Sequence, residues 1–343
     1  MKYFNCDYNE GMTEQILVRM TETNMEQTPG YGEDKYSESA TKKIQDICQA
    51  DVDVHFFVGG TQTNLTFISS VLRPHQGVIS AECGHINTHE SGAIENCGHK
   101  VLVLPAPVGK LTAAQVQEVY GAHADDENRI HAVQPKMVYI SNPTEWGTTY
   151  SKEELCEIYQ VCQENELILY IDGARLAYAL ADRENEMDLS FMANHCDAFY
   201  IGGTKCGAMF GEALVIVTEA LKKDFRYLIK QKGAMLAKGR MLGLQFDTLF
   251  TNNLYQQLGE KGVAMAGIIK AACEKAGYHF LVENNTNQVF PIMPKTKLEK
   301  LRDKYQFMSI GKIENDKEVV RFCTSWATNE DDVLALAKDI AKP

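Results

Sequence analysis

Short apolar segments alternate with helix-like segments from about residue 40 to about residue 220. The strand-like segments lie at 52–58, 77–80, 100–104, 136–140, 167–171 and 198–201. Strands separated by helices are typical of a largely parallel sheet with helices on its faces. The alternation therefore predicts an α/β fold built on such a sheet.

One strand-like segment departs from this alternation. Residues 212–217 (Glu-Ala-Leu-Val-Ile-Val) follow the 198–201 segment too closely for a helix to lie between them. A parallel connection needs a dozen residues or more, so this strand is predicted to run antiparallel to its predecessor. We expect a mixed, mostly parallel sheet.

The chain is long enough for two domains. At 343 residues it exceeds the size at which one hydrophobic core keeps growing. Residues from about 221 to 275 have helical patterns, and the remaining residues indicate a smaller α+β unit. That unit has strands near 289–292 and 319–322 and a closing helix from Asn329. We expect an N-terminal arm (1–24), a large domain (25–250) and a small C-terminal domain (251–343).

Charge and composition limit the partners. The net charge of −12 argues against nucleic acid and anionic membranes. No apolar segment approaches the roughly 18 residues of a membrane span, and the first ten residues, polar and acidic, do not resemble a signal peptide. We expect a cytoplasmic protein with a small-molecule substrate.

The ten cysteines are scattered and form no Cys-x-x-Cys pair. This pattern favours free thiols in a reducing cytoplasm over a disulfide framework or a zinc site. His85 and His89 have metal-binding spacing, but Ile86 stands where a zinc-hydrolase motif has Glu. We therefore expect no metal.

Two polar residues follow strand-like segments that succeed one another along the chain. Asp172 ends the first, in Asp-Gly-Ala-Arg175, and Lys205 follows the second, in Gly-Gly-Thr-Lys. Pyridoxal phosphate needs such a pair, because a carboxylate keeps its pyridine nitrogen protonated and a lysine forms its Schiff base. Polar residues at strand ends are otherwise usually solvated loop residues.

Four further features favour a site for this cofactor. The segment Gly59–Asn64, between a strand and a helix at 65–72, suits a phosphate because glycines expose backbone N–H groups at a helix N-terminus. His85 follows the strand at 77–80 and could stack on the pyridine ring. Arg175 could reach the cofactor's phenolate oxygen or a substrate carboxylate, and Arg321 could bind that carboxylate through paired hydrogen bonds. Each feature alone has an ordinary structural explanation.

Their order along the chain resembles that of fold-type I pyridoxal phosphate enzymes. The chain resembles the threonine aldolase / β-eliminating lyase family over nearly its whole length. The matching segments are Tyr31-Gly-Glu-Asp, Gly59-Gly-Thr, His85 with Glu90-Ser-Gly-Ala, Ile171-Asp-Gly-Ala-Arg, Gly203-Thr-Lys-Cys-Gly and Val320-Arg-Phe.

The resemblance implies a role for each matching residue. It implies that Lys205 binds the cofactor covalently, Asp172 pairs with the ring nitrogen and His85 stacks on the ring. It further implies a homodimer or homotetramer with shared active sites. The remaining implied contacts are Gly60 and Thr61 to phosphate, Arg175 and Arg321 to the substrate carboxylate, and Tyr31 and Arg240 reaching in from a neighbouring subunit.

Two departures from the family pattern concern the substrate. Where many members read Glu-Asn-Thr-His-Asn, this chain reads Ser-Asn-Pro-Thr-Glu-Trp-Gly from Ser141, so the loop histidine is missing. The family's Arg-Ser-Asp is here Asn-Cys-Asp, which puts the thiol of Cys6 near the substrate carboxylate. His89, four residues after His85, is the candidate to supply the lost imidazole, or it fills space.

The implied reaction is cleavage of the Cα–Cβ bond of a β-hydroxy-α-amino acid to glycine and an aldehyde. A first alternative breaks the Cα–H bond instead and leads to β-elimination or racemisation. A second alternative is a protein that binds pyridoxal phosphate with little catalysis.

Overall fold

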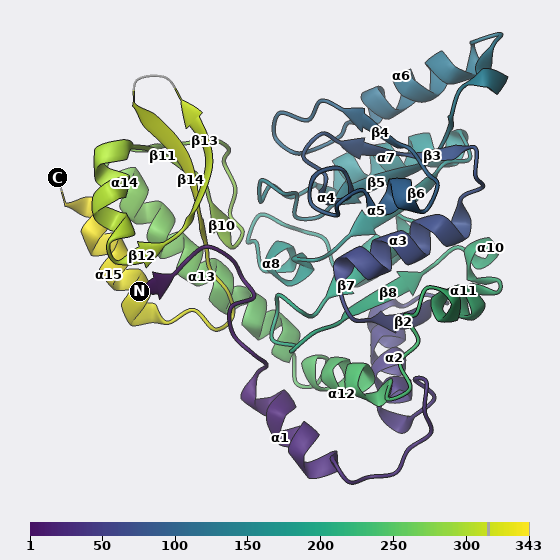
Figure 1. Cartoon of the computed structure of the whole chain (residues 1–343), viewed down its shortest axis with the longest axis horizontal. Coiled ribbons are helices and arrows are strands. Elements are labelled where there is room, and N and C mark those ends of the chain that lie inside the picture. The colour runs from purple at the N-terminus through teal and green to yellow at the C-terminus, as the bar shows by residue number, and fades with distance from the viewer. Residues whose placement is uncertain (314–315, 343) are drawn as a thin grey trace.

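A seven-stranded mixed sheet forms the centre of the large domain (Figure 1). We describe a computed structural model that covers residues 1–313 and 316–342. The strands, in the order β2-β8-β7-β6-β5-β3-β4, are β2 (Asp53–Phe57), β8 (Glu212–Ile216), β7 (Ala198–Gly202), β6 (Ile168–Asp172), β5 (Gln134–Ser141), β3 (Gln76–Ala81) and β4 (Val101–Leu104).

The mixed character of the sheet follows the prediction. β8 runs antiparallel to both β7 and β2, and the other neighbouring pairs are parallel. The short link between β7 and β8 leaves no crossover helix, so the prediction of an antiparallel strand is confirmed.

Both faces of the sheet are covered by helices. Along β6, Leu169 and Ile171 belong to one buried apolar cluster, and Ile168 and Tyr170 belong to the other. Alternate side chains of a strand point to opposite faces, so a strand buried on both faces is apolar throughout. The surrounding helices are α1 (Glu14–Thr23), α2 (Lys35–Cys48), α3 (Gly60–Val71), α4 (His85–Thr88), α5 (Ala93–Asn96), α6 (Ala113–Ala124), α7 (Lys152–Glu164), α8 (Leu176–Leu180), α9 (Leu189–Asn194), α10 (Glu219–Lys222), α11 (Phe225–Gln231) and α12 (Arg240–Leu249), with a 3₁₀ turn at Arg129–His131.

Helix starts follow local chemistry. The side chain of Ser151 accepts a hydrogen bond from the backbone of Glu154, and Glu154 reciprocates, so the predicted capping box of α7 is confirmed. The helix expected at 65–72 instead begins at Gly60, because Gly59 is its extended N-cap residue. The predicted phosphate segment therefore forms the first turn of α3.

Among the residues described, the small domain contains a second sheet and three helices. Its strand order is β10-β14-β11-β9, and β13 also pairs with β14. Figure 1 shows α13 extending from the large domain along the small one. The elements are α13 (Leu254–Lys275), β9 (His279–Phe280), β10 (Gln288–Val289), β11 (Pro291–Pro294), α14 (Lys295–Arg302), β12 (Tyr305–Gln306), β13 (Met308–Ile313), β14 (Lys317–Cys323) and α15 (Glu330–Ala341).

The N-terminal segment joins the two domains. β1 (Lys2–Tyr3) pairs in parallel with β12 of the small domain, and the chain then continues to α1 beside the large domain (Figure 1). The predicted boundaries at residues 24 and 250 stay a prediction. Residues 314–315 and 343 of the expected small domain lie outside the described residues.

The structure also bears on the thiols, on membrane spans and on metal sites. All ten cysteines are free thiols. Among residues 1–313 and 316–342, no helix is both long and apolar enough to cross a membrane. The same residues contain no cluster of three or more His, Cys, Asp or Glu side chains arranged for a metal ion.

Candidate active site

The carboxyl ends of the parallel strands bring the predicted cofactor residues to one edge of the large sheet. Asp172 is the last residue of β6, His85 follows β3, and Lys205 lies in the turn after β7. Ligands of open α/β sheets bind at this edge because the loops after the strands converge there.

Asp172 is almost fully buried and densely hydrogen-bonded. Its Oδ2 accepts from the Tyr139 hydroxyl at 2.5 Å and the Asn64 amide at 3.1 Å, and its Oδ1 accepts from the backbone of Ala174 at 3.0 Å. Burial opposes ionisation, but His85 and the Tyr139 and Tyr200 hydroxyls outweigh it and lower the pKa of Asp172. Asp172 is thus a carboxylate at neutral pH, which suits a protonated ring nitrogen.

His85 is held by a buried carboxylate. Its Nδ1 lies 2.7 Å from Oε1 of Glu90, whose side chain is 0% exposed. The same oxygen accepts from the Asn64 amide at 2.8 Å, and that amide also donates to Asp172. Burial opposes the imidazolium, but Glu90 foremost, with Glu145 and Asp172, outweighs it and raises the pKa of His85. The ring is therefore fixed in orientation.

Lys205 lies in a turn that hydrogen bonds stabilise at both ends. The carboxylate of Glu212 accepts from the backbone of Gly203 at 3.0 Å, and the Thr204 hydroxyl accepts from the backbone of Gly211 at 2.9 Å. Burial raises the pKa of Glu212 to about 8. Within the described chain, the Lys205 ammonium makes no hydrogen bond or ion pair, so it is free to react.

The first turn of α3 forms a cradle for an anion. The leading N–H groups of a helix have no acceptor within that helix, and its dipole favours negative charge there. Gly60 and Thr61 are the first residues of α3. A Cβ atom at Gly60 would lie 2.9 Å from the Tyr200 hydroxyl, so the backbone there can approach its surroundings only as glycine.

These features fit pyridoxal phosphate. The unpaired Lys205 ammonium suits its aldehyde, the ionised Asp172 suits its ring nitrogen, and the start of α3 suits its phosphate. His85, fixed by Glu90, lies at the same edge of the sheet as these three groups.

Arg175 is already engaged by the N-terminal segment. Its Nε and Nη2 donate to the two oxygens of Asp7 at 2.7 and 3.1 Å, and both side chains are buried. Asn287 of the small domain also donates to Asp7, at 2.9 Å. Only Nη1 of Arg175 lies outside this pair, 3.9 Å from Oε2 of Glu145. Asp7 therefore leaves the N–H groups at the Nη1/Nη2 end of Arg175 free, and the carboxylate-binding role of Arg175 stays a prediction.

Arg321 projects from β14 of the small domain. Its Nη1 donates to Gln288 at 3.2 Å and its Nη2 to the backbone oxygen of Asn5 at 2.8 Å. Its Nε is buried without a hydrogen-bond partner in the described chain. Arg321 thus keeps a free donor, and its carboxylate-binding role stays a prediction.

The four remaining predicted residues contact other parts of the chain or, for His89, the ring of His85. The Cys6 thiol donates to Asn9 at 3.1 Å in the N-terminal segment. Tyr31 is 47% exposed on the surface, beneath the Lys230 ammonium. Arg240 donates to backbone oxygens at the end of α1, the shortest bond being 2.8 Å to Thr23. His89 is exposed, and its ring stacks on that of His85 with centroids 5.6 Å apart. Their roles stay predictions.

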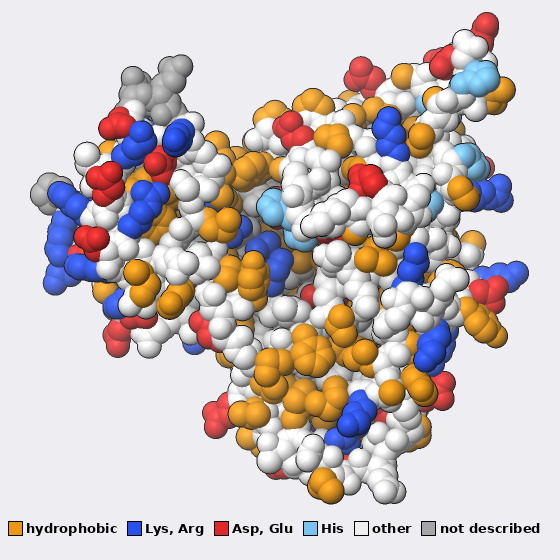
Figure 2. Space-filling model, in the orientation of Figure 1, with side chains coloured by type: hydrophobic (Ala, Val, Ile, Leu, Met, Phe, Trp, Pro, Cys, Tyr) orange, Lys and Arg blue, Asp and Glu red, His pale blue; other side chains and the backbone are white. Residues whose placement is uncertain are grey.

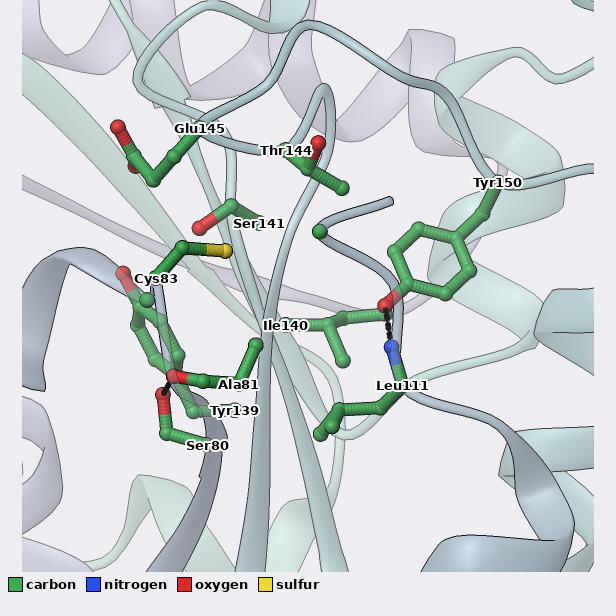
Figure 3. Close-up of a pocket in the computed structure, with 12 residues that line it drawn as sticks. Ser80, Ala81, Cys83, Leu111, Tyr139, Ile140, Ser141, Thr144, Glu145 and Tyr150 are labelled. Atoms are coloured by element: carbon green, nitrogen blue, oxygen red, sulfur yellow. Dashed lines mark hydrogen bonds between the residues drawn. The ribbon is translucent and has the colours of Figure 1, made fainter. Parts of the chain in front are cut away.

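The loop after β5 borders a small hollow beside the ends of β3 and β5 (Figure 3). Ser141, Thr144 and Glu145 line a hollow of about 10 Å³ together with Cys83 and Tyr139. The Ser141 hydroxyl is buried and has no hydrogen-bond partner in the described chain. Glu145 is 19% exposed and faces Arg175.

Sequence reasoning missed several contributors. Asp7, Asn64, Glu90 and Tyr139 were assigned no role, although they fix Arg175, Asp172 and His85. Glu90 belongs to a motif that matches the family, and Asp7 is the residue that Asn-Cys-Asp shares with the family's Arg-Ser-Asp; these were the available signals. Asn64 and Tyr139 look like ordinary helix and strand residues in the sequence.

Comparisons with known proteins agree with this geometry. The family model "Beta-eliminating lyase" matches residues 4–296. A low specificity L-threonine aldolase of a Pseudomonas species is 31% identical over 98% of this chain and 96% of that protein. A Pseudomonas aeruginosa protein of the same name is 29% identical with the same coverage.

Solved structures extend the comparison. A Leishmania major threonine aldolase is 43% identical and superposes with a TM-score of 0.96, covering 99% of this chain and 98% of that one. An aspartate aminotransferase of Thermus thermophilus, 14% identical with a TM-score of 0.69, shares the fold. Since the family model and a full-length relative both match, the chain belongs to the beta-eliminating lyase family of fold-type I enzymes, and its cofactor is pyridoxal phosphate.

Proposed function

We propose that this protein is an aldehyde-lyase that cleaves a β-hydroxy-α-amino acid such as L-threonine to glycine and an aldehyde. The observation that carries the proposal is the unpaired Lys205 ammonium at the same sheet edge as the ionised Asp172 and the Nη1 of Arg175. The relatives, which are named threonine aldolases at 29–43% identity, support cleavage of the Cα–Cβ bond rather than the Cα–H bond.

Each residue of the site has a role that follows from its position. Lys205 binds the cofactor, Asp172 holds the proton at its ring nitrogen, and the start of α3 at Gly60 and Thr61 binds its phosphate. When bound, pyridoxal phosphate accepts the electron pair of the broken bond into its ring. Arg175 Nη1 and Arg321 hold the substrate carboxylate, and this fixes which bond at Cα lies perpendicular to the ring.

The proton of the β-hydroxyl must be accepted as the Cα–Cβ bond breaks. The sequence predicts His89 for this task. The stacking of His89 on His85 supports a place beside the cofactor. If His89 takes the proton, it does so at Nε2, because its Nδ1 lies 2.6 Å from the Thr88 hydroxyl. Glu145, whose Oε2 lies 3.9 Å from Nη1 of Arg175, is the competing candidate.

Product analysis tests the reaction. The loaded protein is incubated with L-threonine, L-allo-threonine, D-threonine and phenylserine, with Lys205→Ala as the control. We expect an aldehyde and glycine in equal amounts. A 2-oxo acid with ammonia would instead indicate β-elimination, and the absence of both product pairs would indicate a binding protein.

We also propose a homodimer or homotetramer in the cytoplasm. Hydrophobic side chains gather on the lower part of the face in Figure 2, where Figure 1 shows α1 and α12. Exposed members of this region and of adjacent loops are Leu17, Val18, Met25, Tyr31 and Met209. Such a surface suits burial against a second copy, which would bring Tyr31 and Arg240 towards a neighbouring site. The cytoplasmic location is proposed because the ten free thiols suit a reducing compartment. Light scattering of the loaded protein tests the assembly, and a fully active monomer would contradict it.

A further inference from the structure

The acidic and imidazole groups around the site differ in whether they can accept a proton. Asp7 and Glu90 are fully buried, and their carboxylates hold Arg175 and His85. Asp172 is committed to the Tyr139 and Asn64 side chains. None of these carboxylates can turn towards a substrate hydroxyl without breaking its own hydrogen bonds.

Glu212 is buried and accepts from the backbone of Gly203, and His85 is held by Glu90. The groups that stay accessible are His89 and Glu145. His89 is exposed and is the C-cap residue of α4, and its Nδ1 lies 2.6 Å from the Thr88 hydroxyl. Glu145 is 19% exposed and accepts no hydrogen bond from the described residues, so its carboxylate is both accessible and uncommitted.

Glu145 lies beside the position that the side chain of a substrate would occupy. Its Oε2 lies 3.9 Å from Nη1 of Arg175, the corner of the guanidinium that Asp7 leaves free. A substrate carboxylate bound at that corner has its β-carbon only two bonds away. Because Glu145 lies beside the same Nη1, this spacing is short enough for the β-hydroxyl to reach the Glu145 carboxylate. Figure 3 shows the Glu145 side chain extending to the same side as the hydroxyl end of Tyr139, which binds Asp172.

The loop that carries Glu145 is rigidly supported. The backbone of Asn142 donates to the Asp172 carbonyl at 2.9 Å, and the Thr144 and Thr148 hydroxyls lie 2.6 Å apart. Asn284 of the small domain donates to the Trp146 carbonyl at 2.8 Å. A base must be held within hydrogen-bond reach of the proton that it accepts, and this support provides the required order.

The hollow beside Glu145 adds a polar neighbour. Its volume of about 10 Å³ is close to the space that one water molecule needs. The Ser141 hydroxyl, buried without a partner in the described chain, lines the same hollow.

We propose that Glu145 is the catalytic base that removes the proton of the substrate's β-hydroxyl. The O–H bond breaks and the proton passes to the Glu145 carboxylate, while the Cα–Cβ bond breaks and a C=O bond forms in the leaving aldehyde. The electron pair left at Cα is withdrawn by the cofactor. Cα then takes up one proton to give glycine, and Glu145 returns its proton to solvent, so the reaction balances. This assignment rests on the proposed aldol cleavage.

The test separates two proton transfers in the loaded enzyme. Glu145→Gln keeps the shape of the side chain but removes the base, and Glu157→Gln, on the exposed face of α7, is the matched control. Aldehyde release from L-threonine needs the hydroxyl base. Exchange of the glycine α-proton in D₂O, followed by NMR, needs the cofactor and carboxylate contacts but involves no hydroxyl.

We expect Glu145→Gln to lower aldehyde release by about 10²–10⁴-fold, with bound cofactor retained and glycine exchange reduced by less than about 10-fold. A parallel loss of glycine exchange would show that Glu145 only holds Arg175, and this would overturn the proposal. A near-normal rate of aldehyde release in Glu145→Gln would also overturn it. So would a large loss confined to His89→Phe. If the wild-type protein releases no aldehyde at all, the proposed function itself fails, which is a distinguishable outcome.

Discussion

Replacing Asp7 by Asn removes the negative charge from the buried pair that joins the N-terminal segment to both domains. Burial opposes ionisation, but Arg175 and Lys205 outweigh it and lower the pKa of Asp7 from 3.8 to about 2. At about 1.36 kcal/mol per pKa unit, the folded state favours the carboxylate by about 2.5 kcal/mol. Removing one partner of a buried ion pair typically costs about 3–5 kcal/mol. We therefore expect Asp7→Asn to lower the free energy of unfolding by about 2.5–5 kcal/mol at pH 7.

Calorimetry of the loaded protein measures this loss. An unfolding entropy of about 2.1 cal/mol/K per residue over 343 residues is about 0.7 kcal/mol/K, so a loss of 2.5 kcal/mol lowers Tm by about 3–4 °C. The exposed Asp125→Asn variant is the matched control.

The pH dependence supplies a second check. Because the folded-state pKa is depressed, the contribution of Asp7 is complete above about pH 4 and is lost as the pH falls towards 2. The Tm gap between wild type and Asp7→Asn should therefore narrow below about pH 4. A Tm for Asp7→Asn equal to that of Asp125→Asn at pH 7, or a gap that does not narrow in acid, would refute this reasoning.

Three further predictions concern the site. Borohydride should attach the cofactor to Lys205, since its ammonium is unpaired in the described chain, and peptide mapping that finds another lysine would contradict this. Asp172→Asn should retain some cofactor by absorbance but lose most activity, because a neutral amide cannot hold the ring proton; an unchanged kcat would exclude Asp172 as the ring partner. Arg321→Lys should raise KM for L-threonine by a factor that corresponds to about 1.5–3 kcal/mol, because an ammonium cannot reproduce the guanidinium fork, and an unaltered KM would remove Arg321 from the site.

Local patterns in the sequence were sufficient for the main elements of the fold. Apolar segments of strand length predicted β2 to β8. The short link between β7 and β8, which contains Lys205, predicted that β8 runs antiparallel to β7 in the large sheet. The capping box at Ser151 was readable because its two hydrogen bonds join residues three positions apart. Gly60 shows the limit of this approach, because polar residues can begin a helix as well as precede it, and the start of α3 was placed too late.

The candidate cofactor residues were visible in the sequence because each ends or follows a strand. Asp172, Lys205 and His85 were chosen in this way, and the structure brings them to one edge of the sheet. The partners of these residues were not predictable, since a hydrogen bond such as that from Asn64 to Asp172 joins positions 108 residues apart.

The sequence by itself therefore determined where strands and helices follow one another along the chain. It also determined which reactive side chains stand at the ends of the strands. Only the tertiary structure decided which charges are already paired. It joined Asp7 to Arg175 across 168 residues and left Glu145, within the described residues, without a hydrogen bond and 3.9 Å from Nη1 of that guanidinium. The physical reason is that periodicity and capping act within a few residues, whereas the pairing and burial of a charge depend on contacts that form only when distant segments pack together.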